Sequence, residues 1–203
     1  MYKLTLQLSL AIEIHHAILQ VVKMHKHLAC TICCAGNSII NNNGTNSGAT
    51  LNMEGGIIQN GETTPCTSSV KSYHGGNMYI TGSGTTANIS GGKILNGYTR
   101  SNGGNIYANS GTIINISGTA LIEGGKSEFT IEKSHNNNYG GGNIYNYGTL
   151  NISGGTVKNG YAMVNGGNIC HQSSNANAVA VSGGHITGGV AAGSVTAYAD
   201  STF

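Results

Sequence analysis

Carboxylate side chains, which carry out most glycosidic bond hydrolysis in proteins, are scarce in this sequence. Hydrolysis of a polysaccharide normally uses two carboxyl groups roughly 5–10 Å apart. Glu54 and Glu123 stand where related segments of the chain have Ser and Asn, so both are expected to be ordinary outward-facing side chains. Lyase chemistry would need acidic metal ligands beside an Arg or Lys base, and Arg100 is the only arginine. The acids of the central region are Glu54, Glu62, Glu123, Glu128 and Glu132. The sequence therefore predicts a protein that is not an enzyme and uses no cofactor.

A cluster of histidines and cysteines near the amino terminus has the residue types that bind Zn²⁺. The segment HKHLACTICC contains His25, His27, Cys30, Cys33 and Cys34. A structural zinc site needs four ligands, usually in two spaced pairs, and no second pair follows at a fitting distance. The sequence therefore predicts no metal site. Residues 1–34 are interpreted as a degenerate export signal or an N-terminal cap, because charged and polar residues interrupt their apolar run.

The rest of the chain repeats one unit. The tetrapeptide Gly-Gly-Asn followed by an aliphatic residue occurs four times, and its asparagines are spaced 28, 38 and 25 residues apart. Five related segments, of which LNISGGTVKNG at 150–160 is typical, alternate with these tetrapeptides along the chain. The repeats cover residues 35–190, and residues 191–203 are a C-terminal tail or the start of a further coil. Repeats of this length indicate a stacked architecture.

The apolar positions inside each unit predict short strands. Leu150 and Ile152 are two residues apart, the period of a half-buried strand, and glycine pairs then turn the chain. We predict an all-β fold, a right-handed parallel β-helix of about five coils with three short strands per coil, whose stacked coils share a core. Three internal columns are expected. The first contains Leu51/Met53, Ala87/Ile89, Ile114/Ile116, Leu150/Ile152 and Val179/Val181; the second Ile58, Ile94, Leu121, Val157 and Ile186; the third Met78, Ile106, Ile144 and Ile169.

The recurring asparagines are expected to form a ladder. An asparagine side chain can pair with the same residue in the next coil and with backbone groups of turns. The ladder residues are Asn77, Asn105, Asn143 and Asn168, with Asn37 in a degenerate copy. Asn88, Asn115 and Asn151 form glycosylation sequons, but their recurrence in one strand register favours a structural role.

Aromatic residues and two long loops are the candidate binding features. Tyr79, Tyr107 and Tyr145 follow the inward aliphatic residues, so they are expected to form an exposed outward stripe that could stack on sugar rings. Loops at 62–74 and 125–140 should leave the same flank, and loops on rigid scaffolds often bind ligands. Their candidate binding residues are Tyr73, His74, Phe129, His135 and Tyr139. Tolerated insertions and a purely structural tyrosine row are the alternatives.

The repeats GGNIYANSGTIINISG and GGNIYNYGTLNISGGTVKNG resemble those of right-handed parallel β-helix proteins, in particular adhesin-like surface proteins of gut bacteria. The likeness to polymorphic outer-membrane adhesins is looser. Members of such families usually carry an export signal and an anchor, so a fragment of a longer protein is one interpretation of the chain.

The resemblance implies a secreted or cell-surface module that adheres to a glycan or a host surface protein. A polysaccharide-degrading enzyme, pectate-lyase-like or a glycosidase, is the alternative, and a phage tail-spike segment would need apolar outer faces. Nine basic and seven acidic residues are scattered along the chain, which argues against binding to nucleic acid.

Overall fold

The computed structural model describes residues 28–29, 40–41, 48–63, 74–128, 139–172 and 178–192. These residues form strands and turns without a helix, and the strands pair in parallel in three sheets, which confirms the parallel β-helix. Sheet A contains β1 Leu28–Ala29, β3 Thr50–Gln59, β6 Thr86–Leu95, β9 Ile113–Ile116, β10 Leu121–Glu123, β13 Thr149–Lys158 and β16 Val179–Thr187. Sheet B contains β2 Ile40–Asn41, β5 Met78–Thr81, β8 Ile106–Ala108, β12 Ile144–Asn146 and β15 Ile169–His171. Sheet C contains β4 Glu62–Thr63, β7 Tyr98–Thr99, β11 Lys126–Ser127, β14 Tyr161–Ala162 and β17 Val190–Ala191.

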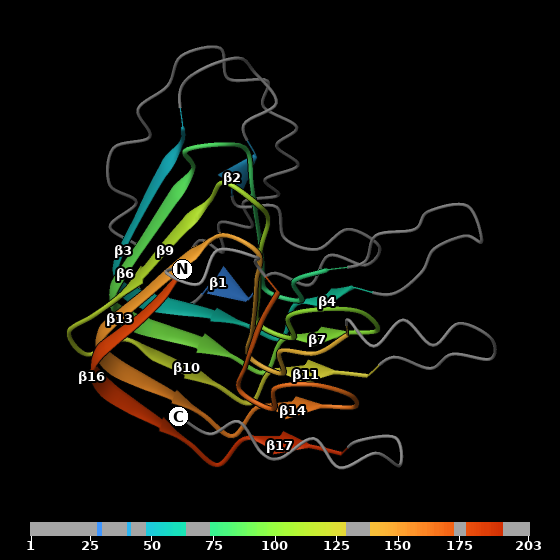
Figure 1. Cartoon of the computed structure of the whole chain (residues 1–203). Helices are drawn as coiled ribbons and strands as arrows, with labels where there is room; N and C mark the ends of the chain where they lie inside the picture. The colour runs from blue at the N-terminus through green and yellow to red at the C-terminus, as the bar shows by residue number, and fades with distance from the viewer. Residues whose placement is uncertain are drawn as a thin grey trace, which may run out of the picture.

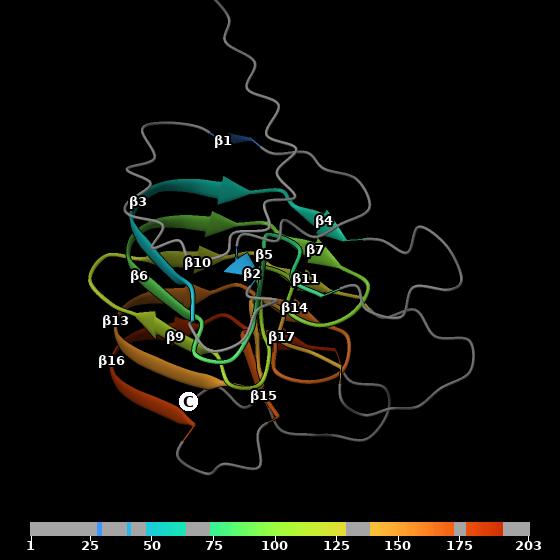
Figure 2. The same ribbon diagram turned by 90° about the horizontal axis from the view of Figure 1, so that it is seen from above.

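Each coil visits sheet A, then sheet C, then sheet B, and then rises to the next coil. Figure 1 shows the strands of sheet C stacked in chain order from β4 to β17, and Figure 2 shows the same stacking turned by 90°. Most predicted coil-to-coil registers are observed; for example, Ile144 pairs with Ile106 on one side and with Ile169 on the other. One coil therefore differs from the next mainly in the length of its loops.

The strands differ from the expectation in one respect. The first two predicted strands of a coil are a single ten-residue strand in β3, β6 and β13, which bends at a glycine pair. The second glycine of the pair has a positive φ, as at Gly92 (78°), where a Cβ atom would lie 2.7 Å from backbone atoms of Gly55. The bend therefore requires glycine both for its conformation and for the close approach of the neighbouring coil. The two-residue strands of sheet C were not predicted.

The core is filled by the predicted columns, with two corrections, at Leu121 and Val181. Eighteen buried apolar residues form one cluster that follows the stacked coils. Leu121 does not belong to it: Ile122, not Leu121, pairs with Ile94 and Val157 and is fully buried. This coil has one more residue between its two core positions than the others, and the extra residue breaks the long strand into β9 and β10. At the last coil, Val181 lies in register with Ile152 but is 48% exposed.

The predicted asparagine ladder is present and buried. The Nδ2 atom of Asn77 donates to Oδ1 of Asn105 at 2.6 Å, Asn105 donates to Asn143 at 2.7 Å, and Asn143 donates to Asn168 at 2.9 Å. Each Oδ1 also accepts from the backbone amide of the turn between sheets A and C, as Asn105 does from Gly97 at 2.8 Å. Each Nδ2 also donates to a carbonyl oxygen of the next coil. Asn37 lies outside the described residues.

A second asparagine ladder runs along the outer side of sheet A. The Nδ2 atoms of Asn88, Asn115 and Asn151 each donate to the Oδ1 atom of the asparagine one coil earlier at 2.8 Å, beginning at Asn52. These half-buried residues include the three sequon asparagines. Their side-chain nitrogens are engaged in the stack, as the structural interpretation of the sequons predicts.

Candidate functional site

The tyrosines expected to form an exposed stripe are largely covered. Tyr107 is 5% exposed, Tyr145 is 0% exposed, and Tyr79 is half-buried. Their rings point away from the aliphatic core, as predicted, and form a second apolar cluster on the outside of sheet B. Neighbouring rings are nearly parallel, with centroids 5.1 Å apart for Tyr79 and Tyr107 and 5.7 Å apart for Tyr107 and Tyr145. The expectation of an exposed aromatic stripe is therefore wrong for this column, because other side chains cover it.

Two residues from turns complete this aromatic column. His74 stacks on Tyr107 with ring centroids 4.2 Å apart, and Tyr147 meets Tyr145 edge-on at 5.2 Å. The Nδ1 atom of His74 lies 2.9 Å from the hydroxyl of Ser101. Burial lowers the pKa of His74 from 6.5 to about 4, so the ring is neutral at physiological pH. We name His74, Tyr79, Tyr107, Tyr145 and Tyr147 the aromatic column.

A cysteine lies next to the aromatic column, one coil after Tyr145. Cys170 pairs with Tyr145 between β15 and β12 and is buried beside it. Burial raises the pKa of the Cys170 thiol to about 11 and keeps it protonated, which makes it a poor nucleophile. The cysteine therefore has the properties of a small packing residue.

Of the remaining predicted binding residues, the structure describes one, Tyr139. Tyr139 is half-buried, and its carbonyl oxygen accepts a hydrogen bond from the amide of Asn165 at 3.0 Å. Tyr73, Phe129 and His135 lie outside the described residues, as do the histidines and cysteines of the amino-terminal segment. Of the predicted binding residues, the structure therefore brings together only His74, Tyr79, Tyr107 and Tyr145.

An accessible aromatic cluster lies instead on the outer face of sheet C. Its strands are short and alternate, so Thr99, Ser127 and Ala162 point inward and are buried while the preceding residues point outward. In register on three successive coils these outward residues are Tyr98, Lys126 and Tyr161. The two tyrosines are half-buried and Lys126 is exposed. A second outward row on the same coils consists of Arg100, Glu128 and Met163, whose amides continue the backbone pairing. We name these six residues the sheet C platform.

An ion pair joins two of the charged side chains on the platform. Lys126 Nζ lies 2.7 Å from Glu128 Oε1 and 5.5 Å from the ring centroid of Tyr161. The hydrogen bond to Glu128 raises the pKa of Lys126 and keeps it charged. With Glu62, which occupies the same outward position one coil before Tyr98, the described residues of this face include two cationic and two anionic side chains. The described part of the face therefore presents aromatic rings and hydrogen-bonding groups with balanced charge.

The platform tyrosines have a sequence signal in their position after a turn. Tyr98 and Tyr161 both directly follow an Asn-Gly turn, and the asparagines of these turns, Asn96 and Asn159, have positive φ angles of 52° and 54°. Lys126 follows the equivalent Gly124-Gly125 turn. Because the turn fixes where the next strand begins, the residue after it always points outward. The position directly after each turn therefore identifies the row Tyr98, Lys126 and Tyr161 from the sequence.

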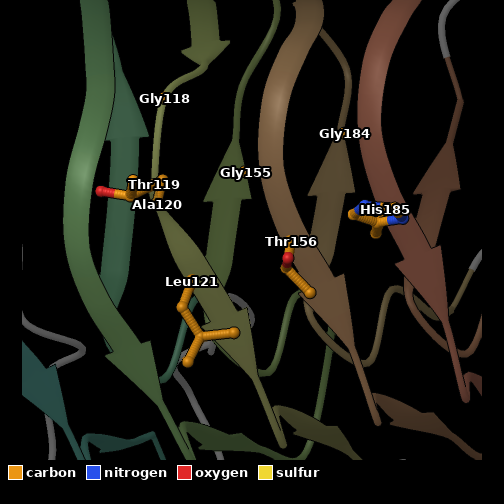
Figure 3. Close-up of a pocket in the computed structure, with 8 residues that line it drawn as sticks. All are labelled: Gly118, Thr119, Ala120, Leu121, Gly155, Thr156, Gly184 and His185. Atoms are coloured by element: carbon orange, nitrogen blue, oxygen red, sulfur yellow. The ribbon is translucent and has the colours of Figure 1, made fainter.

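An open hollow on the outside of sheet A is the second surface feature. It lies at the strand bends of the last three coils, where Leu121, Thr156 and His185 are side by side (Figure 3). It is lined by Gly118, Thr119, Ala120, Leu121, Gly155, Thr156, Gly184 and His185. A Cβ atom on Gly118 would lie 2.4 Å from the carbonyl oxygen of Ser90, so contact between coils explains the missing side chain. The hollow therefore follows from the packing of the bends.

The acidic residues of the described coils are dispersed. Glu54 and Glu62 are exposed on different sheets, Glu123 lies 3.4 Å from Lys158, and Glu128 is paired with Lys126. Within the described ranges, no three His, Cys, Asp or Glu side chains come together as metal ligands. None of the secondary structure described is a helix with the length and apolarity that would cross a bilayer.

Comparison with known proteins gives no relative. No protein-family model, no curated protein and no solved structure matches the chain.

Proposed function

We propose that the chain is a non-enzymatic, extracellular or cell-surface repeat module that binds carbohydrate on the sheet C platform. The observation that carries the proposal is the ordered row Tyr98, Lys126 and Tyr161, held on three successive coils of a rigid scaffold. Aromatic rings present apolar faces against which the C–H faces of sugars pack. The aromatic column on sheet B is too well covered to serve this purpose.

The spacing of the platform suits an extended glycan. Successive coils of parallel strands are about 4.8 Å apart, so the two tyrosines are separated by about 10 Å along the stack. A glycan lying parallel to the axis would reach both rings and pass over Lys126, whose ammonium group donates hydrogen bonds to hydroxyl groups. Since the described residues of the face have balanced charge, a neutral glycan is favoured over an acidic one.

Binding to immobilised glycans tests the proposal. Neutral linear pentaoses of glucose, mannose and N-acetylglucosamine, with a pentauronate for comparison, would be titrated with the full chain by surface plasmon resonance. Replacing both platform tyrosines, Tyr98→Ala with Tyr161→Ala, is expected to weaken binding at least about tenfold, which corresponds to about 1.4 kcal/mol. Leu121→Ala is the matched control, because Leu121 is also half-buried and outward-facing but lies on sheet A.

The outcomes separate the alternatives. Equal loss of binding in the Leu121→Ala control, or no neutral glycan bound by the unaltered chain, would overturn the assignment to the platform. Release of new reducing ends from any of the same oligosaccharides would overturn the non-enzymatic interpretation and favour a polysaccharide-degrading protein.

A further inference from the structure

Three of the turns between sheets A and C contain the dipeptide Asn-Gly, in which asparagine is prone to deamidation. The glycine nitrogen can attack the Cγ atom of the asparagine side chain, and glycine favours this attack because it has no Cβ atom to hinder the approach. The new N–C bond closes a succinimide ring, the side-chain nitrogen leaves as ammonia, and water then opens the ring to aspartate or isoaspartate. The three pairs, all with an exposed asparagine, are Asn60-Gly61, Asn96-Gly97 and Asn159-Gly160.

The geometry of the turn favours this reactive dipeptide. The asparagines of the three pairs have φ angles of 57°, 52° and 54°, a conformation that asparagine adopts more readily than most residues other than glycine. A Cβ atom on the following glycine would overlap a backbone carbonyl oxygen, as at Gly97, where the oxygen is that of Gly104. The equivalent turn before β11 has glycine at both positions, Gly124 and Gly125. Few other residues therefore fit these two positions.

The glycine amide of each pair is bound by a residue of the buried asparagine ladder. The amide donates to a side-chain Oδ1 atom, from Gly61 to Asn77 at 2.7 Å, from Gly97 to Asn105 at 2.8 Å and from Gly160 to Asn168 at 2.9 Å. Donor and acceptor residues are buried in all three cases. Deamidation requires the glycine nitrogen to lose its proton and to turn toward the Cγ atom of the preceding asparagine. Both steps break the hydrogen bond to the ladder.

We propose that the buried asparagine ladder protects the Asn-Gly turns from deamidation, in addition to joining the coils. The reaction can proceed only when a local opening separates the glycine amide from the ladder, so its rate falls with the population of the opened state. The ladder asparagines are themselves poor substrates, because each is buried and is followed by Met or Ile, whose side chain hinders access to the next backbone nitrogen. Asparagines that react slowly therefore protect asparagines that would react quickly.

Deamidation of these turns would disturb the coil at a sensitive position. Isoaspartate continues the main chain through its side-chain carbon and so adds an atom to the backbone of the turn. The turns at 96–97 and 159–160 lead directly into β7 and β14, which pair with the neighbouring coils through only two residues each. An added backbone atom would therefore displace these short strands from their register.

The test is deamidation of the full chain in mildly alkaline buffer, measured at each turn by peptide mapping and mass spectrometry. Replacing one ladder residue should accelerate deamidation at one turn by at least about tenfold, because one glycine amide loses its buried acceptor. Asn143→Ala is the matched control, since Asn143 is also buried in the ladder but accepts from Gly125 of a Gly-Gly turn, which cannot deamidate. The expected pairs of variant and accelerated site are Asn77→Ala with Asn60, Asn105→Ala with Asn96, and Asn168→Ala with Asn159.

The unaltered chain provides a measurement that does not depend on a variant. Its three Asn-Gly pairs should deamidate at least about tenfold more slowly in the folded chain than in denaturing guanidinium chloride, and the three glycine amides should be slow in hydrogen exchange. Equal rates in the folded and denatured chain, or rapid exchange of these amides, would overturn the proposal. So would equal acceleration of all three turns by ladder variants that remain folded, with Asn143→Ala among them. Because no ligand takes part, these results do not depend on the proposed function.

Discussion

The outer faces of sheets B and C carry the same type of residue in very different surroundings. On sheet B, Tyr107 and Tyr145 point away from the core and are nevertheless buried. On sheet C, Tyr98 and Tyr161 also point away from the core and remain half-exposed beside Lys126. The alternation of inward and outward residues is the same on both sheets, so it does not decide whether a ring is accessible. Accessibility depends on whether residues from the adjacent turns pack against the ring.

The covering residues on sheet B come from the turns on either side of it. His74 belongs to the segment that enters the Gly-Gly-Asn turn before β5, and Tyr147 belongs to the turn after β12. Both place their rings against the tyrosines. On sheet C the neighbours of the tyrosines in the row are the charged residues Glu62 and Lys126 and the apolar Val190, and all three are exposed. The outside of sheet B therefore acts as a small second core, whereas the outside of sheet C is a surface.

The largest expected difference between the two faces is in stability. Tyr107→Ala removes a ring that contacts all four other rings of the aromatic column and should lower the free energy of unfolding by about 3–5 kcal/mol, as for other buried aromatic residues. Tyr161→Ala removes a half-exposed ring and its contact with Lys126, and should lower it by about 1 kcal/mol or less. Urea unfolding of both variants, followed by circular dichroism, measures the difference. Similar losses in the two variants would mean that the faces are energetically equivalent.

The sequence was most informative where one requirement recurs in every coil. The buried asparagines satisfy the same turn amide and the same carbonyl of the next coil each time, so spacing alone identified Asn77, Asn105, Asn143 and Asn168. The aliphatic columns were identified for the same reason. Repetition turns a local hydrogen-bonding or packing requirement into a visible pattern.

The sequence was less informative where one coil departs from the others or where distant turns meet. Counting five residues forward from Ile116, as in the other coils, places Leu121 in the core, but this coil has one extra residue and Ile122 takes the position instead. Counting back from the turn would have selected Ile122, since Ile94 and Val157 also lie two residues before their turns. The covering of Tyr107 by His74 depends on where a loop returns to the coil, and no periodicity encodes that position.

The buried histidine makes the stability of the aromatic column depend on pH. The pKa of His74 is about 4 in the folded chain and about 6.5 when unfolded, so between these values the unfolded chain binds more protons. The free energy of unfolding is therefore highest above pH 6.5, where His74 is neutral in both states. It falls as the pH drops from 6.5 to 4, and the loss due to His74 is at most about 3 kcal/mol. Urea midpoints measured across this range should fall with pH.

His74→Phe isolates this effect from other titrating groups. Phenylalanine keeps a ring against Tyr107 but cannot be protonated, so the variant should lose less stability than the unaltered chain between pH 6.5 and 4. The pKa of His74 can also be followed directly by NMR titration of the ring. An ordinary value near 6.5, together with parallel pH profiles for the two proteins, would show that the ring is solvated.

The smallest expected difference concerns single hydroxyl groups. The Tyr145 hydroxyl donates to the Tyr147 hydroxyl at 3.3 Å, and burial raises the pKa of Tyr145 above its ordinary value. Tyr145→Phe should therefore lower the free energy of unfolding by about 1 kcal/mol, since the partner hydroxyl loses a donor. Tyr98→Phe on the platform should change it by less than about 0.5 kcal/mol, because water replaces any bond that a half-exposed hydroxyl loses. Paired urea titrations resolve this difference, and a larger loss in the platform variant would reverse the assignment of the two faces.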